Sequence, residues 1–143
     1  MNILQIGILI FTVIEFGNII MLYFNPNSRI GNGIGIFNSW KKSKKDTEFH
    51  EFAGYLVNWV AGTKLIFIMM AIVVIIFGNE LTQLFTIIAL IISILSFFWR
   101  LYPAILRMDK KDQITPKGYS KTLLIMIIGF IVVFLIVLLI YFF

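Results

Sequence analysis

Two residues of opposite charge, Glu15 and Lys64, lie inside long apolar segments of this sequence. A charge in hydrocarbon is costly, so such residues are commonly paired or belong to an ion pathway. Glu15 lies nine residues before Phe24, and Lys64 lies nine residues after Tyr55. At a rise of about 1.5 Å per residue, both lie roughly 13 to 14 Å from the ends of their helices, near the bilayer midplane. Consecutive helices run antiparallel and are commonly neighbours, so the sequence predicts an intramembrane Glu15–Lys64 ion pair.

Other polar residues in the apolar segments extend this candidate site. Thr12 and Asn18 lie on faces near Glu15 and could support it. In the third apolar segment, small and hydroxylated residues fall in one helical stripe about 80° wide, which we expect to face the bundle. Its polar members either allow close helix packing or line a narrow path toward a basic residue: Thr82, Thr86, Ser93, Ser96 and Arg100.

Familiar catalytic and metal-binding patterns are incomplete. His50 and Glu51 begin a zincin-like motif, but His50 is the only histidine. Asp109 and Asp112 lie among basic residues and read as a solvated charge cluster. The glycines between residues 31 and 35 read as a flexible turn, and the chain has no cysteine. We therefore expect no metal site, no cofactor and no enzymatic activity.

The composition indicates the elements that position these residues. Hydrophobic residues make up 60% of the chain, charged residues only 13%, and the mean hydropathy is +0.98. Four apolar segments are each long enough to cross a bilayer as a helix. The first exceeds the apolar run of a signal peptide, so we expect it to be retained. The prediction is an all-α integral membrane protein, residues 1–143 forming one four-helix bundle with helices at about 3–24, 55–77, 81–101 and 122–143.

The basic residues predict an orientation. Eleven of the twelve lie between Arg29 and Lys45 or between Arg100 and Lys121, in or next to the connections at about 25–54 and 102–121, which we expect to be cytoplasmic, with both termini outside. The first connection should contain a short amphipathic segment at the membrane interface. Asp46 should cap the second helix and Ser120 the fourth. We expect a multi-pass protein of a prokaryotic plasma membrane, with no nucleic-acid partner, whose lysines contact anionic lipid headgroups: Lys41, Lys42, Lys44 and Lys45.

Two classes of function fit these features. The first is a non-enzymatic subunit or regulator of a membrane assembly, in which Glu15 and Lys64 fix the helix register. The second is a small proton- or cation-coupled transporter or channel that uses Glu15 and can assemble as a homo-oligomer. In topology, a four-span chain with a glutamate in its first helix resembles the small multidrug resistance transporters, which implies ion exchange at Glu15. The long basic first connection and Lys64 depart from that pattern. Because a glutamate neutralised by lysine is less free to exchange protons, the first class is favoured.

Overall fold

The computed structural model describes residues 1–30 and 33–143, so two residues of the glycine-containing turn, Gly31 and Asn32, lie outside the described chain. The described residues are helical and form no β-strand. In chain order the elements are α1 (Ile3–Phe24), η1 (Ile34–Ile36), α2 (Asn38–Ser43), α3 (Thr47–Phe77), α4 (Glu80–Leu95), η2 (Ser96–Phe98), α5 (Leu101–Lys110) and α6 (Tyr119–Phe142).

Four helical stretches are long and apolar enough to span a membrane, which confirms the predicted all-helical class. The first and last of these agree closely with the sequence-based boundaries. α3 begins earlier than 55, because the Asp46 carboxylate caps it by accepting a hydrogen bond from Phe49 N at 3.1 Å. The cap satisfies a backbone N–H of the first turn, so the helix can begin before the apolar segment that would lie in the bilayer.

The third helical stretch, Glu80–Lys110, includes the predicted range 81–101 but is interrupted. α4 stops at Leu95, a short 3₁₀ turn follows, and α5 begins at Leu101. Pro103 explains the break. Proline has no N–H to donate, and its ring clashes with the carbonyl of the residue four positions earlier, here Trp99, so an uninterrupted α-helix through Trp99 is disfavoured.

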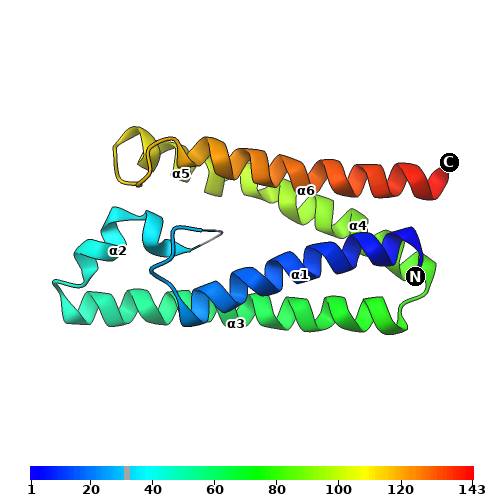
Figure 1. Ribbon diagram of the computed structural model, residues 1–143, viewed down its shortest axis with the longest axis horizontal. Coiled ribbons are helices and arrows are strands. Elements are labelled where there is room, and N and C mark those ends of the chain that lie inside the picture. The colour runs from blue at the N-terminus through cyan, green and yellow to red at the C-terminus, as the bar shows by residue number, and fades with distance from the viewer. Residues whose placement is uncertain (31–32) are drawn as a thin grey trace.

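The long helices form two groups (Figure 1). α1 packs along α3, and α4 packs along α6, while α1 also contacts α4 and α6. The groups meet at the end that carries both chain termini and separate toward the opposite end, which carries the two long connections. We call these the terminal end and the loop end.

A separate hydrophobic core stabilises each end. The core at the terminal end joins α1, α3, α4 and α6 through Leu4, Ile8, Phe11, Ala71, Ile87, Leu90, Phe134 and Val137. At Gly7 the helices approach closely, since an added Cβ would lie 3.0 Å from Val137 Cγ2. The core at the loop end is smaller and consists of Ile36, Ile114, Tyr119 and Leu123.

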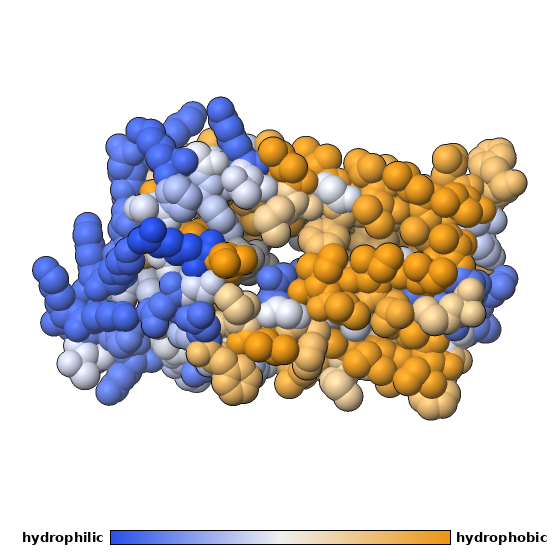
Figure 2. All heavy atoms as spheres, viewed as in Figure 1, coloured by the Kyte–Doolittle hydropathy of each residue, from blue (hydrophilic) through white to orange (hydrophobic). Residues whose placement is uncertain are grey.

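The two basic connections are joined to one another. Phe37 and Ile114 form an isolated antiparallel bridge, in which Asn38 N donates to Gln113 O at 2.9 Å and Thr115 N donates to Ile36 O at 2.8 Å. The connections therefore form one hydrophilic cap at the loop end, next to the apolar body of the bundle (Figure 2). The four lysines from Lys41 to Lys45 are all exposed on this cap.

Candidate functional site: an ion pair on the wall of a cavity

The two intramembrane charges lie in direct contact. Lys64 Nζ donates to Glu15 Oε2 at 2.5 Å, and Asn18 Nδ2 donates to the other carboxylate oxygen at 3.3 Å. α1 supplies Glu15 and Asn18, which lie three positions apart and so share a helical face, while α3 supplies Lys64. Both oxygens of the carboxylate are thereby satisfied inside an otherwise apolar region.

Burial of the pair is uneven. The Glu15 side chain is 14% exposed, whereas that of Lys64 is 29% exposed. The residues of α3 that pack most closely against the bundle lie on the face of Lys64, where Ala61 and Ala71 are buried. Small residues on that face let α1 approach, which brings the two charges within reach.

The exposed side of the pair faces a cavity of about 620 Å³. It lies between the α1/α3 and α4/α6 groups, where the space-filling view shows a hollow with hydrophilic atoms at its rim (Figure 2). Residues of both cores border it, Phe11 and Leu90 from the terminal end and Leu123 from the loop end. The cavity is thus the unfilled region between the two cores.

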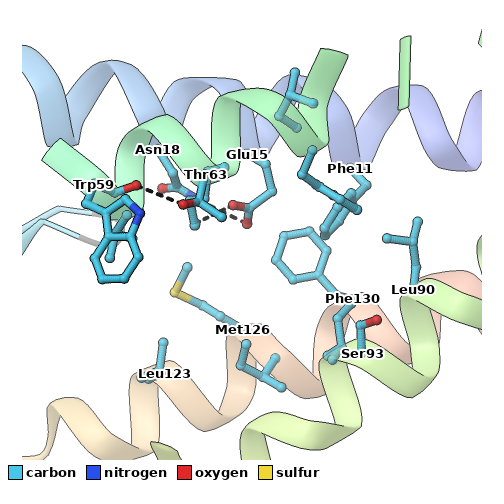
Figure 3. Close-up of a pocket in the computed structure, with 16 residues that line it drawn as sticks. Phe11, Glu15, Asn18, Trp59, Thr63, Leu90, Ser93, Leu123, Met126 and Phe130 are labelled. Atoms are coloured by element: carbon cyan, nitrogen blue, oxygen red, sulfur yellow. Dashed lines mark hydrogen bonds and ion pairs between the residues drawn. The ribbon is translucent and has the colours of Figure 1, made fainter. Parts of the chain in front are cut away.

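The two walls of the cavity differ in chemistry (Figure 3). Polar groups are concentrated on the α1/α3 wall, which carries Glu15, Asn18, Thr63 and Lys64. The opposite wall is apolar except for Ser93 on α4. Its other lining residues include Leu90, Ile94, Leu123, Met126, Ile127 and Phe130. Sequence reasoning identified the charged residues but missed the apolar wall, because apolar positions that line a space and those that face lipid have the same residue types.

An aromatic cluster closes the cavity toward the terminal end. The ring of Phe11 lies 5.3 Å from that of Phe130 and 6.2 Å from that of Phe67, both in edge-to-face geometry, and 5.5 Å from the ring of Phe134. These contacts join α1 to α3 and α6 on the terminal-end side of the ion pair. They separate the cavity from the buried core beyond it.

Thr12 does not take part in this site. It is buried, but its hydroxyl donates to the carbonyl of Ile8 in its own helix at 2.7 Å. This intrahelical bond satisfies the hydroxyl locally and leaves Glu15 with Asn18 and Lys64 as its partners.

The polar stripe of the third span does not face the bundle as expected. The buried face of α4 instead carries Gln83, Ile87 and Leu90. Among the stripe residues, Ser96 and Arg100 are exposed, Thr86 is half-buried, and Ser93 lies on the cavity wall. The reason is local bonding: Thr86 donates to Thr82 O at 2.7 Å and Ser96 to Ser93 O at 2.6 Å. Hydroxyls satisfied in this way need no partner helix. Arg100 lies with its guanidinium carbon 5.4 Å from the Trp99 ring centre.

A second polar group, which the sequence analysis missed, lies at the terminal end. Gln83 is 1% exposed, accepts a hydrogen bond from Asn2 Nδ2 at 2.8 Å and donates to Gly78 O at 2.7 Å. Gln5 donates to Ile75 O at 3.1 Å. We call Asn2, Gln5 and Gln83 the amide cluster. The available signal was the presence of side-chain amides at the starts of the first and third apolar segments.

Two further polar contacts lie at the loop end. The Asp109 carboxylate is buried and accepts bonds from Gly118 N at 2.8 Å and from Ser120 N and Oγ at 3.0 and 2.6 Å. It therefore caps α6 from α5, so the predicted Ser120 cap and the solvated-cluster interpretation of Asp109 are both wrong. Folding brings the end of α5 to the start of α6, where a carboxylate is a stronger acceptor than a hydroxyl.

The single histidine, His50, contacts Ser43 and Trp40. His50 Nδ1 lies 2.8 Å from Ser43 Oγ, and its ring lies 4.6 Å from that of Trp40. The Ser43 hydroxyl also lies within hydrogen-bond distance of Trp40 O, at 2.8 Å, so it bridges the His50 ring to the backbone of α2. Trp40 Nε1 donates to Asn27 Oδ1 at 2.9 Å, and the Trp40 side chain is buried. No group of three metal-ligating side chains occurs within the described residues.

The fold and site define a class: a helical protein with four membrane-length apolar helices and an ion pair between two of them, beside a cavity. No protein-family model matches the chain, and neither the search of curated proteins nor that of solved structures finds a match.

Proposed function

We propose that this protein is a non-enzymatic subunit or regulator of a membrane assembly, in which the Glu15–Lys64 pair holds α1 and α3 in register. The observation that carries the proposal is the contact of Glu15 Oε2 with Lys64 Nζ while Asn18 occupies the other oxygen. An ion pair between α1 and α3 in an apolar region holds the two helices in one register, because separating the partners would leave a charge without its counterion.

A double-mutant cycle tests this role. The full-length protein in detergent is compared with Glu15→Leu, Lys64→Met and the double variant by thermal unfolding. If the residues act as a pair, the double variant should be destabilised by much less than the sum of the two single losses. A swapped variant, with lysine at 15 and glutamate at 64, should be more stable than either single variant. Additive losses would contradict the structural role.

The alternative is a proton- or cation-coupled transporter that uses Glu15. One observation supports it: the pair borders a cavity of about 620 Å³ that could admit a substrate. Infrared difference spectroscopy distinguishes the two functions. A carboxylic-acid band that titrates near neutral pH and vanishes in Glu15→Gln would support transport, whereas a carboxylate band unchanged across that range supports the structural role.

The hydrophilic cap is proposed to be cytoplasmic and to contact anionic lipid headgroups through Lys41, Lys42, Lys44 and Lys45. Its support is the concentration of eleven of the twelve basic residues between Arg29 and Lys45 and between Arg100 and Lys121. Because the chain has no cysteine, single cysteines at exposed positions can report orientation. Lys44→Cys and Lys111→Cys should be shielded from an impermeant thiol reagent in intact cells, and Glu80→Cys should be labelled. The reverse pattern would invert the proposed orientation.

Assembly partners are proposed to meet the apolar surface of α6 or the basic cap. α6 has many exposed apolar side chains, including Ile125 and Leu139 at 70% and 60% exposure. Its spanning part, from Leu123 onward, has no charged side chain. Both another copy of this chain and a different membrane subunit could use such a surface.

A further inference from the structure

The cavity beside the ion pair is large for a protein interior. Interiors are close-packed and contain few voids larger than one water molecule, whereas small-molecule sites measure about 300 to 1,000 Å³. At about 620 Å³ this cavity falls in the second range. It lies within the membrane-length part of the helices and is open to the outside of the bundle (Figure 2). In a bilayer, apolar molecules or lipid chains from the surrounding hydrocarbon would therefore enter the cavity.

Neither water nor a helix fits this space well. The lining is predominantly apolar, and a stable buried water needs about two to four polar partners. A helix about 10 Å across with a rise of about 1.5 Å fills roughly 120 Å³ per residue, so the cavity would hold little more than one turn. A flexible hydrocarbon chain is narrower and can follow the apolar wall formed by residues such as Met126, Ile127 and Phe130.

The polar residues of the cavity retain open donors, and among the described lining residues Lys64 carries the only positive charge. An ammonium group has three N–H donors, and among the described contacts Lys64 makes one hydrogen bond, to Glu15. The Trp59 indole N–H and the Ser93 hydroxyl donate no hydrogen bond among those described. Both carboxylate oxygens of Glu15 are already bonded. The N–H groups of Lys64 that have no acceptor among the described contacts favour a ligand with an acceptor oxygen.

We propose that this cavity binds one neutral amphiphile whose ester or ketone oxygen accepts a hydrogen bond from Lys64, with its apolar chain between α3 and α6. The inference rests on the proposed structural pair, because only a persistent Glu15–Lys64 contact keeps the ammonium in this position. The pair has no net charge, and an added anion would lie beside the Glu15 carboxylate. That repulsion favours a neutral carbonyl over a carboxylate or phosphate.

Native mass spectrometry of the full chain in detergent tests the ligand class. Monoolein carries one ester carbonyl, and its ether analogue 1-O-oleylglycerol lacks it. We expect one bound monoolein and at least about tenfold weaker binding of the ether, because a charge-assisted hydrogen bond is lost. Equal binding of the two, tighter binding of oleate than of monoolein, or no monoolein binding would each overturn the proposal.

Matched substitutions test the location. Ser93→Trp and Met126→Trp place bulk in the cavity from α4 and α6, the two helices of its apolar wall, and should reduce monoolein binding at least about tenfold. The controls Ala89→Trp and Ile125→Trp alter exposed positions on the same helices outside the lining and should bind as the wild type does. Equal binding by all four variants would overturn the cavity site. The result is independent of the double-mutant cycle, because that cycle changes only residues 15 and 64.

A further comparison identifies the source of the ligand. Dioleoylphosphatidylcholine supplies the same ester carbonyl from an ordinary membrane lipid. If it competes with monoolein at comparable concentration, the occupant is a bilayer lipid chain. If monoolein binds and the phospholipid does not compete, the occupant is a free neutral lipophile. Both results retain the carbonyl–Lys64 contact, and loss of monoolein selectivity over the ether overturns it.

Discussion

The ion pair and the amide cluster both satisfy polar side chains within apolar helices, but they do so in different ways. The amide cluster is neutral and tightly enclosed: Gln83 is 1% exposed and has a partner for both its oxygen and its nitrogen. The Glu15–Lys64 pair is charged and borders a cavity, with Lys64 29% exposed. The difference indicates that the terminal end is built for packing, whereas the middle of the bundle retains space and unsatisfied donors.

The largest expected effect is at the ion pair. Lys64→Met leaves Glu15 partly buried and without its cation, and breaking such a pair typically costs about 3 to 5 kcal/mol. Thermal unfolding in detergent should show this loss relative to Ile66→Met, an exposed position on the same helix. A loss below about 1 kcal/mol would mean that the cavity hydrates Glu15 and that the two polar sites are more alike than proposed.

The next effect tests close packing at the terminal end. Gly7→Leu places side-chain atoms where even a Cβ lies 3.0 Å from Val137 Cγ2, and overpacking of this kind costs about 1 to 3 kcal/mol. Gly17→Leu is the matched control on α1, because no atom lies within 4 Å of its added Cβ. Equal unfolding temperatures for both variants would show that the terminal end is not tightly packed.

A smaller loss is expected in the amide cluster. Gln83→Leu leaves Gly78 O and the Asn2 amide without their partner, and an unsatisfied buried polar group costs about 1 to 3 kcal/mol. We expect the lower part of that range, because Asn2 and Gly78 lie near helix ends that water can reach. Circular dichroism melting should place Gln83→Leu between Lys64→Met and wild type. If Gln83→Leu lost as much stability as Lys64→Met, the charged and the neutral site would not differ in the way proposed.

The smallest effect concerns the hydroxyl stripe of α4. Thr86→Val and Ser96→Ala remove hydrogen bonds made within one helix, and we expect changes within about 0.5 kcal/mol, measured by the same melting experiment. A loss above about 1 kcal/mol at either position would indicate that the stripe contacts a partner in the assembled protein.

The sequence predicts best the features for which all other arrangements would be much higher in free energy. Apolar length and composition alone predict four spanning helices, because backbone groups in hydrocarbon must be bonded internally. The equal depths of Glu15 and Lys64 follow from residue counting, and the price of an unpaired charge in lipid indicates that they should meet. The Asp46 cap could also be predicted, because it depends on residues three positions apart.

Other features depend on contacts between distant segments, and only the tertiary structure decides them. Asp109 caps α6 because α5 and α6 meet end to end, and Gln83 is buried because α1 and α4 cross beside it. The direction of the α4 stripe could not be read from periodicity, since hydroxyls bonded to their own helix are equally stable facing lipid or protein. The cavity is decided in the same way: it exists because two helix groups meet at one end and separate at the other, an angle that side-chain packing sets and that no local pattern in the sequence contains.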